Sequence, residues 1–231
     1  MTSKGYSEVH YIWYTSGMNK IIFLPDYSEG LRSELSSSIE QWNKELMVLL
    51  PNLPDDIIIE FDNNQLIQGY GTGGTAWDLR TLKLGYDPNF GANPEDLIKE
   101  LRAIYFHEIY HLVRKFSFIT TPNDLPALTN AIEEGVATKF EMVHGGGMPS
   151  YGKCEERNTM LDWLEEVKAL PDGFDYDWEH WKFFDPETGR QWILYKVGVF
   201  IVDELLKNNP KLSIKSVVFL DAEKIFKFSK L

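Results

Sequence analysis

The sequence contains a single cysteine, Cys154, among its 231 residues. A disulfide within the chain is therefore impossible, and a zinc ribbon built from several cysteines is excluded. One thiol without a partner is typical of a protein in a reducing compartment. No nucleophile motif surrounds Cys154, and the chain has no GxSxG sequence of the serine-hydrolase type. We therefore expect neither a thiol nor a serine nucleophile.

Long apolar runs are also lacking. No stretch approaches the ~20 residues that a membrane-spanning helix needs. The N-terminal sequence MTSKGYSEVHYIWYTSG has no apolar segment followed by small residues, which would mark a secretory signal. We expect a soluble, cytoplasmic protein without a membrane partner.

Basic residues are in the minority, because 23 Lys and Arg face 35 Asp and Glu and the formal net charge is −12. Such an acidic chain has little long-range attraction for phosphates, so we expect no nucleic-acid partner. The cluster of Lys224, Lys227 and Lys230 is expected to be a solvated face. Hydrophobic residues make up 43% of the chain, which is enough to bury one core. With no linker visible, we expect one domain over residues 1–231.

Residues 1–90 carry the strand signals. β-branched and aromatic residues concentrate in three segments, EVHYIWY (8–14), KIIFLP (20–25) and DDIIIEF (55–61). Between them, apolar residues recur at three- and four-residue steps and predict a helix over residues 30–50, which Pro51 ends. One or two further strands are expected within residues 75–87.

The segment GYGTGG matches the spacing GxGxxG with Gly69, Gly71 and Gly74. A dinucleotide site of this type needs a helix directly after the glycines, so that the pyrophosphate can lie at its N-terminus. The residues that follow are strand-like, so a plain turn is the favoured interpretation.

Residues 91–231 are helical by pattern. Asn93 is a candidate N-cap and Pro94 a candidate first helical residue. This helix is expected to continue beyond residue 111, before a loop over 116–124. Further helices are expected from Pro126 to the glycines at 145–147, over 155–170 and over 192–207, with an irregular aromatic segment between the last two. The predicted class is α+β.

The sequence IYFHEIYH contains the motif HExxH at His107, Glu108 and His111. Residues i and i+4 of a helix are offset by only ~40°, so both imidazoles can reach one Zn²⁺ ion. Glu108 points beside such an ion, where it can act as general base towards a zinc-bound water. The alternative is a hydrogen-bonded histidine pair of no catalytic role. Burying two histidines and a glutamate in an apolar helix without partners would be costly, which favours the metal site.

A second segment, NAIEEGVATKFE, follows the motif at residues 130–141. HExxH followed by an acidic residue before Gly-Val-Ala resembles the gluzincin metallopeptidases, and the match makes Glu134 the third zinc ligand. The order of these segments is similar to that in a bacterial family of predicted zinc-dependent proteases of unknown physiological role. The resemblance implies a zincin-like fold, in which the HExxH helix packs beside the Glu134 helix with a twisted sheet behind them. An edge strand within residues 75–86 would then bind an extended peptide.

Other site residues are less strongly indicated. Glu133 is the alternative ligand, otherwise expected in solvent or in a supporting position. Thr138 and Glu141 lie one and two turns after Glu134 and could hydrogen-bond the far nitrogen of a ligating histidine, or be exposed helix polars. Gluzincins typically add a tyrosine or histidine that stabilises the oxyanion, and Tyr195 is the first candidate. His180 is the second candidate for this role, and Tyr151 and Tyr176 are further candidates.

The function that these patterns predict is a zinc-dependent hydrolase, most simply a peptidase acting on a peptide or protein substrate. Glu108 would be base and then proton donor as zinc-bound water attacks the carbonyl. Two alternatives stay open. One is a zincin-fold binding or regulatory protein without turnover, although such a scaffold has no need of Glu108. The other is a metal-dependent hydrolase of a non-peptide amide or ester.

Overall fold

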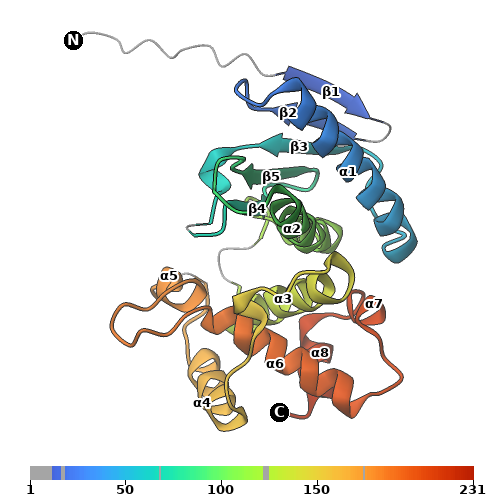
Figure 1. Cartoon of the computed structure of the whole chain (residues 1–231). Coiled ribbons are helices and arrows are strands. Elements are labelled where there is room, and N and C mark those ends of the chain that lie inside the picture. Colours follow the sequence, from blue (N-terminus) through green and yellow to red (C-terminus); the bar gives the residue numbers. More distant parts are fainter. Residues whose placement is uncertain (1–11, 17–18, 68, 122–124, 174) are drawn as a thin grey trace, which may run out of the picture.

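The computed structural model describes residues 12–16, 19–67, 69–121, 125–173 and 175–231 (Figure 1). The first part contains β1 (Ile12–Ser16), β2 (Asn19–Phe23), α1 (Glu29–Leu49), β3 (Ile57–Phe61), a 3-10 turn (Asn63–Gln65), β4 (Thr72–Ala76) and β5 (Thr81–Tyr86). The later part contains α2 (Pro94–Arg114), α3 (Ala127–Phe140), a wide π turn (Glu141–Gly145), a 3-10 turn (Ser150–Gly152), α4 (Arg157–Lys168), α5 (Trp178–Lys182), α6 (Ile193–Asn208), α7 (Ile214–Val217) and α8 (Ala222–Ser229). Strands thus precede most of the helices, as the predicted α+β class requires.

The strands form one mixed sheet in the order β1-β2-β3-β5-β4. β2, β3 and β5 run parallel, whereas β1 and β4 pair antiparallel with their neighbours at the two edges. The central strand β3 alternates buried and half-buried residues, with Ile57, Ile59 and Phe61 buried. This period of two is the pattern that predicted the strand. β4 is the edge strand on the side of the later helices.

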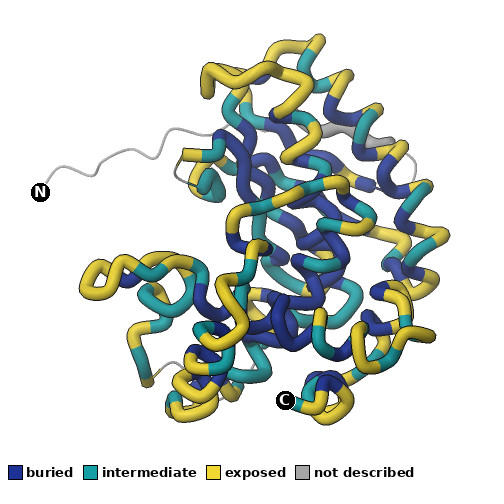
Figure 2. Tube along the Cα trace, turned by 60° about the horizontal axis from the view of Figure 1, so that its bottom comes forward, coloured by how far each residue is buried: buried dark blue, intermediate teal, exposed yellow. Residues whose placement is uncertain are grey.

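Helices α1 and α2 cover one face of the sheet. α1 packs against β1 and β2, and α2 packs against β4 and β5. The two helices meet where the rings of Trp42 and Tyr105 lie 5.7 Å apart, and the Tyr105 hydroxyl donates to Asn43 at 2.8 Å. The remaining helices lie on the other side of α2 from the sheet (Figure 1). Figure 2 shows the buried part of the trace in the middle of the molecule, between exposed outer turns.

Helices α3 and α6 cross at a contact between two glycines. A Cβ atom built on Gly135 would overlap the backbone of Gly198, and one built on Gly198 would overlap the carbonyl oxygen of Ala131. Only glycine allows two helix backbones to approach so closely. This contact fixes the spacing of α6 from the helix that carries Glu134.

Several predicted elements differ from the structure. β4 begins at Thr72 inside the glycine segment, so only the first half of GYGTGG is a turn. The helix expected from Pro126 to the glycines does reach Gly145, but it is α-helical only to Phe140 and finishes as the π turn. The aromatic segment expected to be irregular contains the short helix α5. α7 and α8 were not predicted. The start of the first predicted strand, residues 8–11, lies outside the described residues.

None of the helices in the described ranges combines the length and the apolar character that crossing a bilayer requires.

Candidate metal centre

The helix α2 brings two histidines to one buried point. Its N-terminus is as predicted: the Asn93 side chain accepts from the Glu95 backbone N–H at 3.1 Å, and Pro94 is the first helical residue. His107 and His111 follow on the face turned to α3, and each is 5% exposed. Their Nε2 atoms lie 3.1 Å apart. The i, i+4 spacing therefore places both nitrogens at one site, as predicted.

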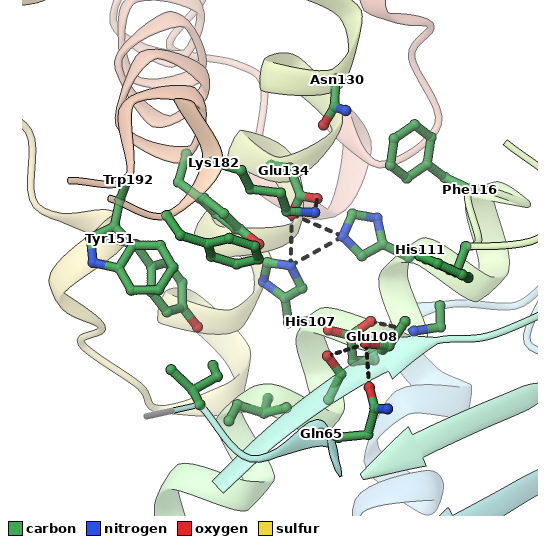
Figure 3. A pocket seen from close by; sticks show the side chains of 18 of the residues that line it. Gln65, His107, Glu108, His111, Phe116, Asn130, Glu134, Tyr151, Lys182 and Trp192 are labelled. Carbon is green, nitrogen blue, oxygen red and sulfur yellow. Dashed lines mark hydrogen bonds and ion pairs between the residues drawn. The ribbon is translucent and has the colours of Figure 1, made fainter. Parts of the chain in front are cut away.

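Glu134 of α3 completes a group of three. Its Oε2 atom lies 3.2 Å from His107 Nε2 and 3.3 Å from His111 Nε2 (Figure 3). A tetrahedral zinc site with bonds of about 2.0–2.1 Å separates its ligand atoms by about 3.3 Å. The three atoms already have this spacing, and each can supply a lone pair. Together these three residues form a His-His-Glu group that is suited to holding a metal ion. The cofactor that fits this group is Zn²⁺.

Glu141 supports His107 from behind. Its Oε2 atom lies 3.0 Å from His107 Nδ1, and the Tyr151 hydroxyl donates to the same carboxylate at 3.0 Å. With Nδ1 donating to Glu141, a neutral His107 directs the lone pair of Nε2 towards Glu134. Glu141 is 2% exposed, so it is no exposed helix polar.

Thr138 does not take the supporting position that was predicted beside Glu141. It is fully buried, but its Oγ1 atom has no hydrogen-bond partner among the described residues, and neither has His111 Nδ1. The methyl group of Thr138 instead faces the backbone at Gly152. Neither predicted alternative describes Thr138, because it is buried and yet makes no hydrogen bond to a histidine nitrogen.

The charges at the group are coupled. Burial by itself would lower the pKa of His107, but the carboxylates of Glu134 and Glu141 raise it to about 10. Burial would raise the pKa of Glu134, yet Lys182 and His111 hold it well below its usual range. The two pKa shifts are opposite in direction because the facing atoms favour a positive charge between them, which a bound cation would supply.

Glu108 lies beside this group and faces the edge strand. Its Oε2 atom accepts from the Ala76 backbone N–H at 2.6 Å. The approach is close because Gly74 has no side chain: a Cβ there would lie 2.7 Å from Ile104 Cγ2 and 2.9 Å from Glu108 Cγ. Glu108 is only 9% exposed and lines the same cavity as both histidines. It is therefore positioned next to the metal group without belonging to it.

Glu133 is neither in solvent nor in the His-His-Glu group, so it is not the alternative ligand that the sequence left open. It is 5% exposed and binds Arg114 of α2 through two hydrogen bonds, of 2.6 and 3.2 Å. The Tyr110 hydroxyl donates to it at 3.1 Å. The helical periodicity correctly placed the two glutamates on different faces of the helix. The partner Arg114 lies three residues beyond the HExxH motif, and no sequence pattern marked it.

The four residues considered as donors to the oxyanion lie in different surroundings. Tyr195 lies at the cavity and is half-buried. Burial first, and then the Glu134 carboxylate with which it forms a hydrogen bond, raise its pKa well above the usual range. His180 is a poor second candidate, because it pairs with Asp177 at 3.4 Å outside this cavity. The Tyr151 hydroxyl donates to Glu141, and Tyr176 packs against the core.

Lys182 was not predicted to be a site residue. This residue ends α5, and its Nζ atom donates to Glu134 Oε1 at 2.8 Å. The two oxygens of Glu134 are therefore divided, one facing the histidines and the other facing the lysine (Figure 3). No periodic pattern marks residues 173–191, so nothing in the sequence placed this lysine at the site.

The group lies in a cavity of about 1060 Å³ between the sheet edge and the later helices. β4 forms one wall with Gly74, Thr75 and Ala76, and aromatic residues of the segment 178–195 form the opposite wall. Trp178, Phe183 and Phe184 line it, whereas Trp181 packs against the core. The cavity is large enough for several residues of an extended chain.

The structure was compared with known proteins. A crystal structure of an aminopeptidase N family protein from Idiomarina loihiensis is similar, with a TM-score of 0.51 and 13% sequence identity. The similarity covers 96% of this chain but only 41% of that chain, so this protein corresponds to less than half of it. At this identity the likeness concerns the fold alone. A search of curated proteins gives no match.

The family comparison covers most of the sequence. Residues 32–227, which include every residue of the group above, match the model of a family described as "Predicted Zn-dependent protease (DUF2268)". The description names the same metal that the spacing of His107, His111 and Glu134 fits. The chain belongs to this family of predicted zinc-dependent proteases.

Proposed function

We propose that this protein is a zinc-dependent peptidase with a zincin-like fold, formed as one domain by residues 1–231. One observation carries the proposal: His107, His111 and Glu134 converge to zinc-like spacing, and Glu108 lies beside them on an open cavity. A scaffold that only binds metal needs the first three residues but not the fourth. The family description and the likeness to an aminopeptidase N family protein support the same reaction class.

The roles of the chain's own residues follow from their positions. When bound, Zn²⁺ supplies Lewis acidity that activates a water and polarises a carbonyl. One oxygen of Glu108 remains on the Ala76 N–H, so the other can accept the proton of the attacking water. The water oxygen bonds to the carbonyl carbon, and the carbonyl π electrons move to its oxygen. As the C=O bond re-forms and the C–N bond breaks, Glu108 gives the proton to the leaving nitrogen.

β4 is the strand on which an extended substrate would pair, and it lies earlier than the predicted range of 75–86. The backbone N–H and C=O groups of Thr72, Gly74 and Ala76 point away from β5. The chain itself already uses both ends of this edge: Thr72 O accepts from Ile67 N at 3.0 Å, and Ala76 O accepts from Phe118 N at 2.8 Å. Gly74 lies between them and lines the cavity. We infer that a substrate forms its ladder pair at Gly74, next to Glu108.

Glu108→Gln tests the mechanism, because an amide cannot accept the proton. The variant should retain zinc and lose most hydrolysis in a broad fluorogenic peptide screen of the zinc-loaded protein. Glu100→Gln, an exposed change on the same helix, is the control and should behave like the parent. Equal turnover by the Glu108→Gln variant would overturn the proposed mechanism. A zinc-loaded parent that cleaves no peptide would favour a binding protein, or, if it cleaves p-nitrophenyl acetate through Glu108, a hydrolase of non-peptide esters.

A further inference from the structure

Lys182 has no assigned role, yet it is the residue that changes the charge of the site. Among the described residues that line the cavity, it is the one lysine or arginine. The side chain is 21% exposed, so it is partly desolvated but still reaches the cavity. An ammonium group has three donors and no acceptor. Glu134 Oε1 takes one of these donors at 2.8 Å, which leaves two for a ligand.

The charges of the neighbouring carboxylates and of a bound zinc ion indicate which kind of ligand the two remaining donors of Lys182 would bind. Glu108, Glu134 and Glu141 carry three negative charges, and a zinc ion would bring two positive ones. Without Lys182 this arrangement is negative by one charge before any substrate enters, and with Lys182 it is neutral. Attack on a carbonyl adds a further negative charge at its oxygen. A cation one carboxylate away from the metal position is therefore placed to offset the charge that develops during the reaction.

The segment around Lys182 is built to hold it there. The Nζ atom lies 5.6 Å from the centres of the Trp178 and Tyr195 rings and 6.0 Å from that of Phe183. The segment returns to α6 through a bond of 2.9 Å from Trp192 N to Phe183 O. Trp192 itself has a φ of 59°, which is unusual for a bulky residue. Such backbone strain is kept where the surrounding structure requires it.

We propose that Lys182 is a catalytic residue that donates to the oxyanion formed when the substrate carbonyl is attacked, an inference that rests on the proposed peptidase function. It keeps its protons throughout and acts by charge and hydrogen bonding alone. The ring centre of Tyr195 lies 5.6 Å from Lys182 Nζ, and its hydroxyl would be a neutral donor to the same oxygen. A charge-assisted hydrogen bond is roughly twice as strong as a neutral one, so the lysine should make the larger contribution.

The simpler alternative is that Lys182 only neutralises and orients Glu134. Two binding measurements separate the roles without any turnover. Methylphosphonate is a tetrahedral anion that resembles the attacked carbonyl, whereas imidazole is a neutral ligand for an accessible zinc ion. Each probe is titrated calorimetrically into the zinc-loaded protein. Lys182→Met should weaken the binding of methylphosphonate by about tenfold or more. The same variant should change the binding of imidazole by less than about threefold. A residue that only orients Glu134 would affect both probes alike.

Two further variants sharpen the test. Lys182→Arg keeps the charge and should retain most of the methylphosphonate affinity. Lys196→Met is the matched control: this lysine is 11% exposed and pairs with Glu155 at 2.6 Å, outside the residues that line the cavity. It should leave both probes unchanged. Equal weakening of both probes by Lys182→Met, or no selective effect on methylphosphonate, would overturn the proposal.

Kinetics extend the test to the reaction. With a cleaved peptide, Lys182→Met should lower kcat about 10²- to 10³-fold with KM little changed, the loss typical of one oxyanion donor. An unchanged kcat would overturn the catalytic role even if methylphosphonate binding falls. Should the parent cleave no peptide, the proposed function fails, while the two probes still decide whether Lys182 binds a tetrahedral anion at the metal site.

Discussion

Glu133 and Glu134 are adjacent in α3, yet their carboxylates bind different parts of α2. Glu134 meets the Nε2 atoms of the two histidines, whereas Glu133 pairs with Arg114 one helical turn further on. Successive residues on a helix point about 100° apart, so one helix can supply a ligand and a structural ion pair side by side. Exchanging their roles would require α3 to rotate against α2.

This division predicts two different outcomes on removing each carboxylate. Glu134→Ala should weaken zinc affinity strongly, as should His107→Ala, because each removes a ligand from a buried site. Glu133→Ala should keep zinc but lower the free energy of unfolding by about 2–4 kcal/mol, since it leaves the largely buried Arg114 charge without its partner. Chelator titration and urea unfolding of the three variants provide the measurement. Zinc loss from Glu133→Ala alone would mean that the two roles are reversed.

Tyr195→Phe removes only the hydroxyl that faces Glu134. We expect kcat to fall on the order of 10²-fold with zinc retained and KM little changed, because a neutral donor to the oxyanion is lost. Zinc content and steady-state kinetics on a cleaved peptide measure both effects. Activity within about twofold of the parent would remove Tyr195 from the mechanism and leave Lys182 as the proposed donor, since His180 lies elsewhere.

The crossing of α3 and α6 predicts a large effect of one methyl group. Gly198→Ala would push its Cβ into the Ala131 carbonyl oxygen, and relieving the overlap should cost about 1–3 kcal/mol or more of unfolding free energy. Gly30→Ala in the first turn of α1 is the control, since a Cβ there meets nothing within 4 Å and the free energy of unfolding should stay the same or rise slightly. Thermal unfolding of both variants measures the difference. Similar melting temperatures would show that the helices can separate freely.

Cys154 should be a slow nucleophile. Burial, and then the negative charge of Asp203, raise the pKa of its thiol to about 11, so the thiolate fraction below pH 9 is about a hundredfold smaller than for an ordinary cysteine. The rate of alkylation by iodoacetamide should therefore rise about tenfold per pH unit from pH 8 to pH 10 without levelling off. The urea-unfolded protein should level off near pH 9 and serves as the control. A plateau at pH 8 in the folded protein would contradict the raised pKa.

The parts of the site that the sequence predicted are those encoded by local geometry. The spacing of His107 and His111 decides that their side chains meet, whatever the rest of the fold, and Asn93 and Pro94 fix where that helix begins. The phase of α3 likewise separated Glu134 from Glu133. These relationships lie within single helices, so periodicity alone was enough to find them.

The parts that were missed depend on contacts between distant segments. Lys182 reaches Glu134 from 48 residues away, and Arg114 reaches Glu133 from another helix. Neither carries a local pattern, because a lysine in an aromatic segment looks the same whether it faces solvent or a carboxylate. β4 was placed too late because glycine has low strand propensity. Here Gly73 and Gly74 are required by the close approach of the neighbouring backbone and of α2.

The two bonds that close the outer edge of β4 also protect the protein itself. An edge strand with free backbone groups is a template on which another chain can pair, and such pairing leads to aggregation. The bonds of Ile67 N to Thr72 O and of Phe118 N to Ala76 O occupy this edge on either side of Gly74. These two bonds therefore hinder a second sheet from extending along the outer edge of β4. The substrate pairing proposed at Gly74 would use only the short part of the edge between them.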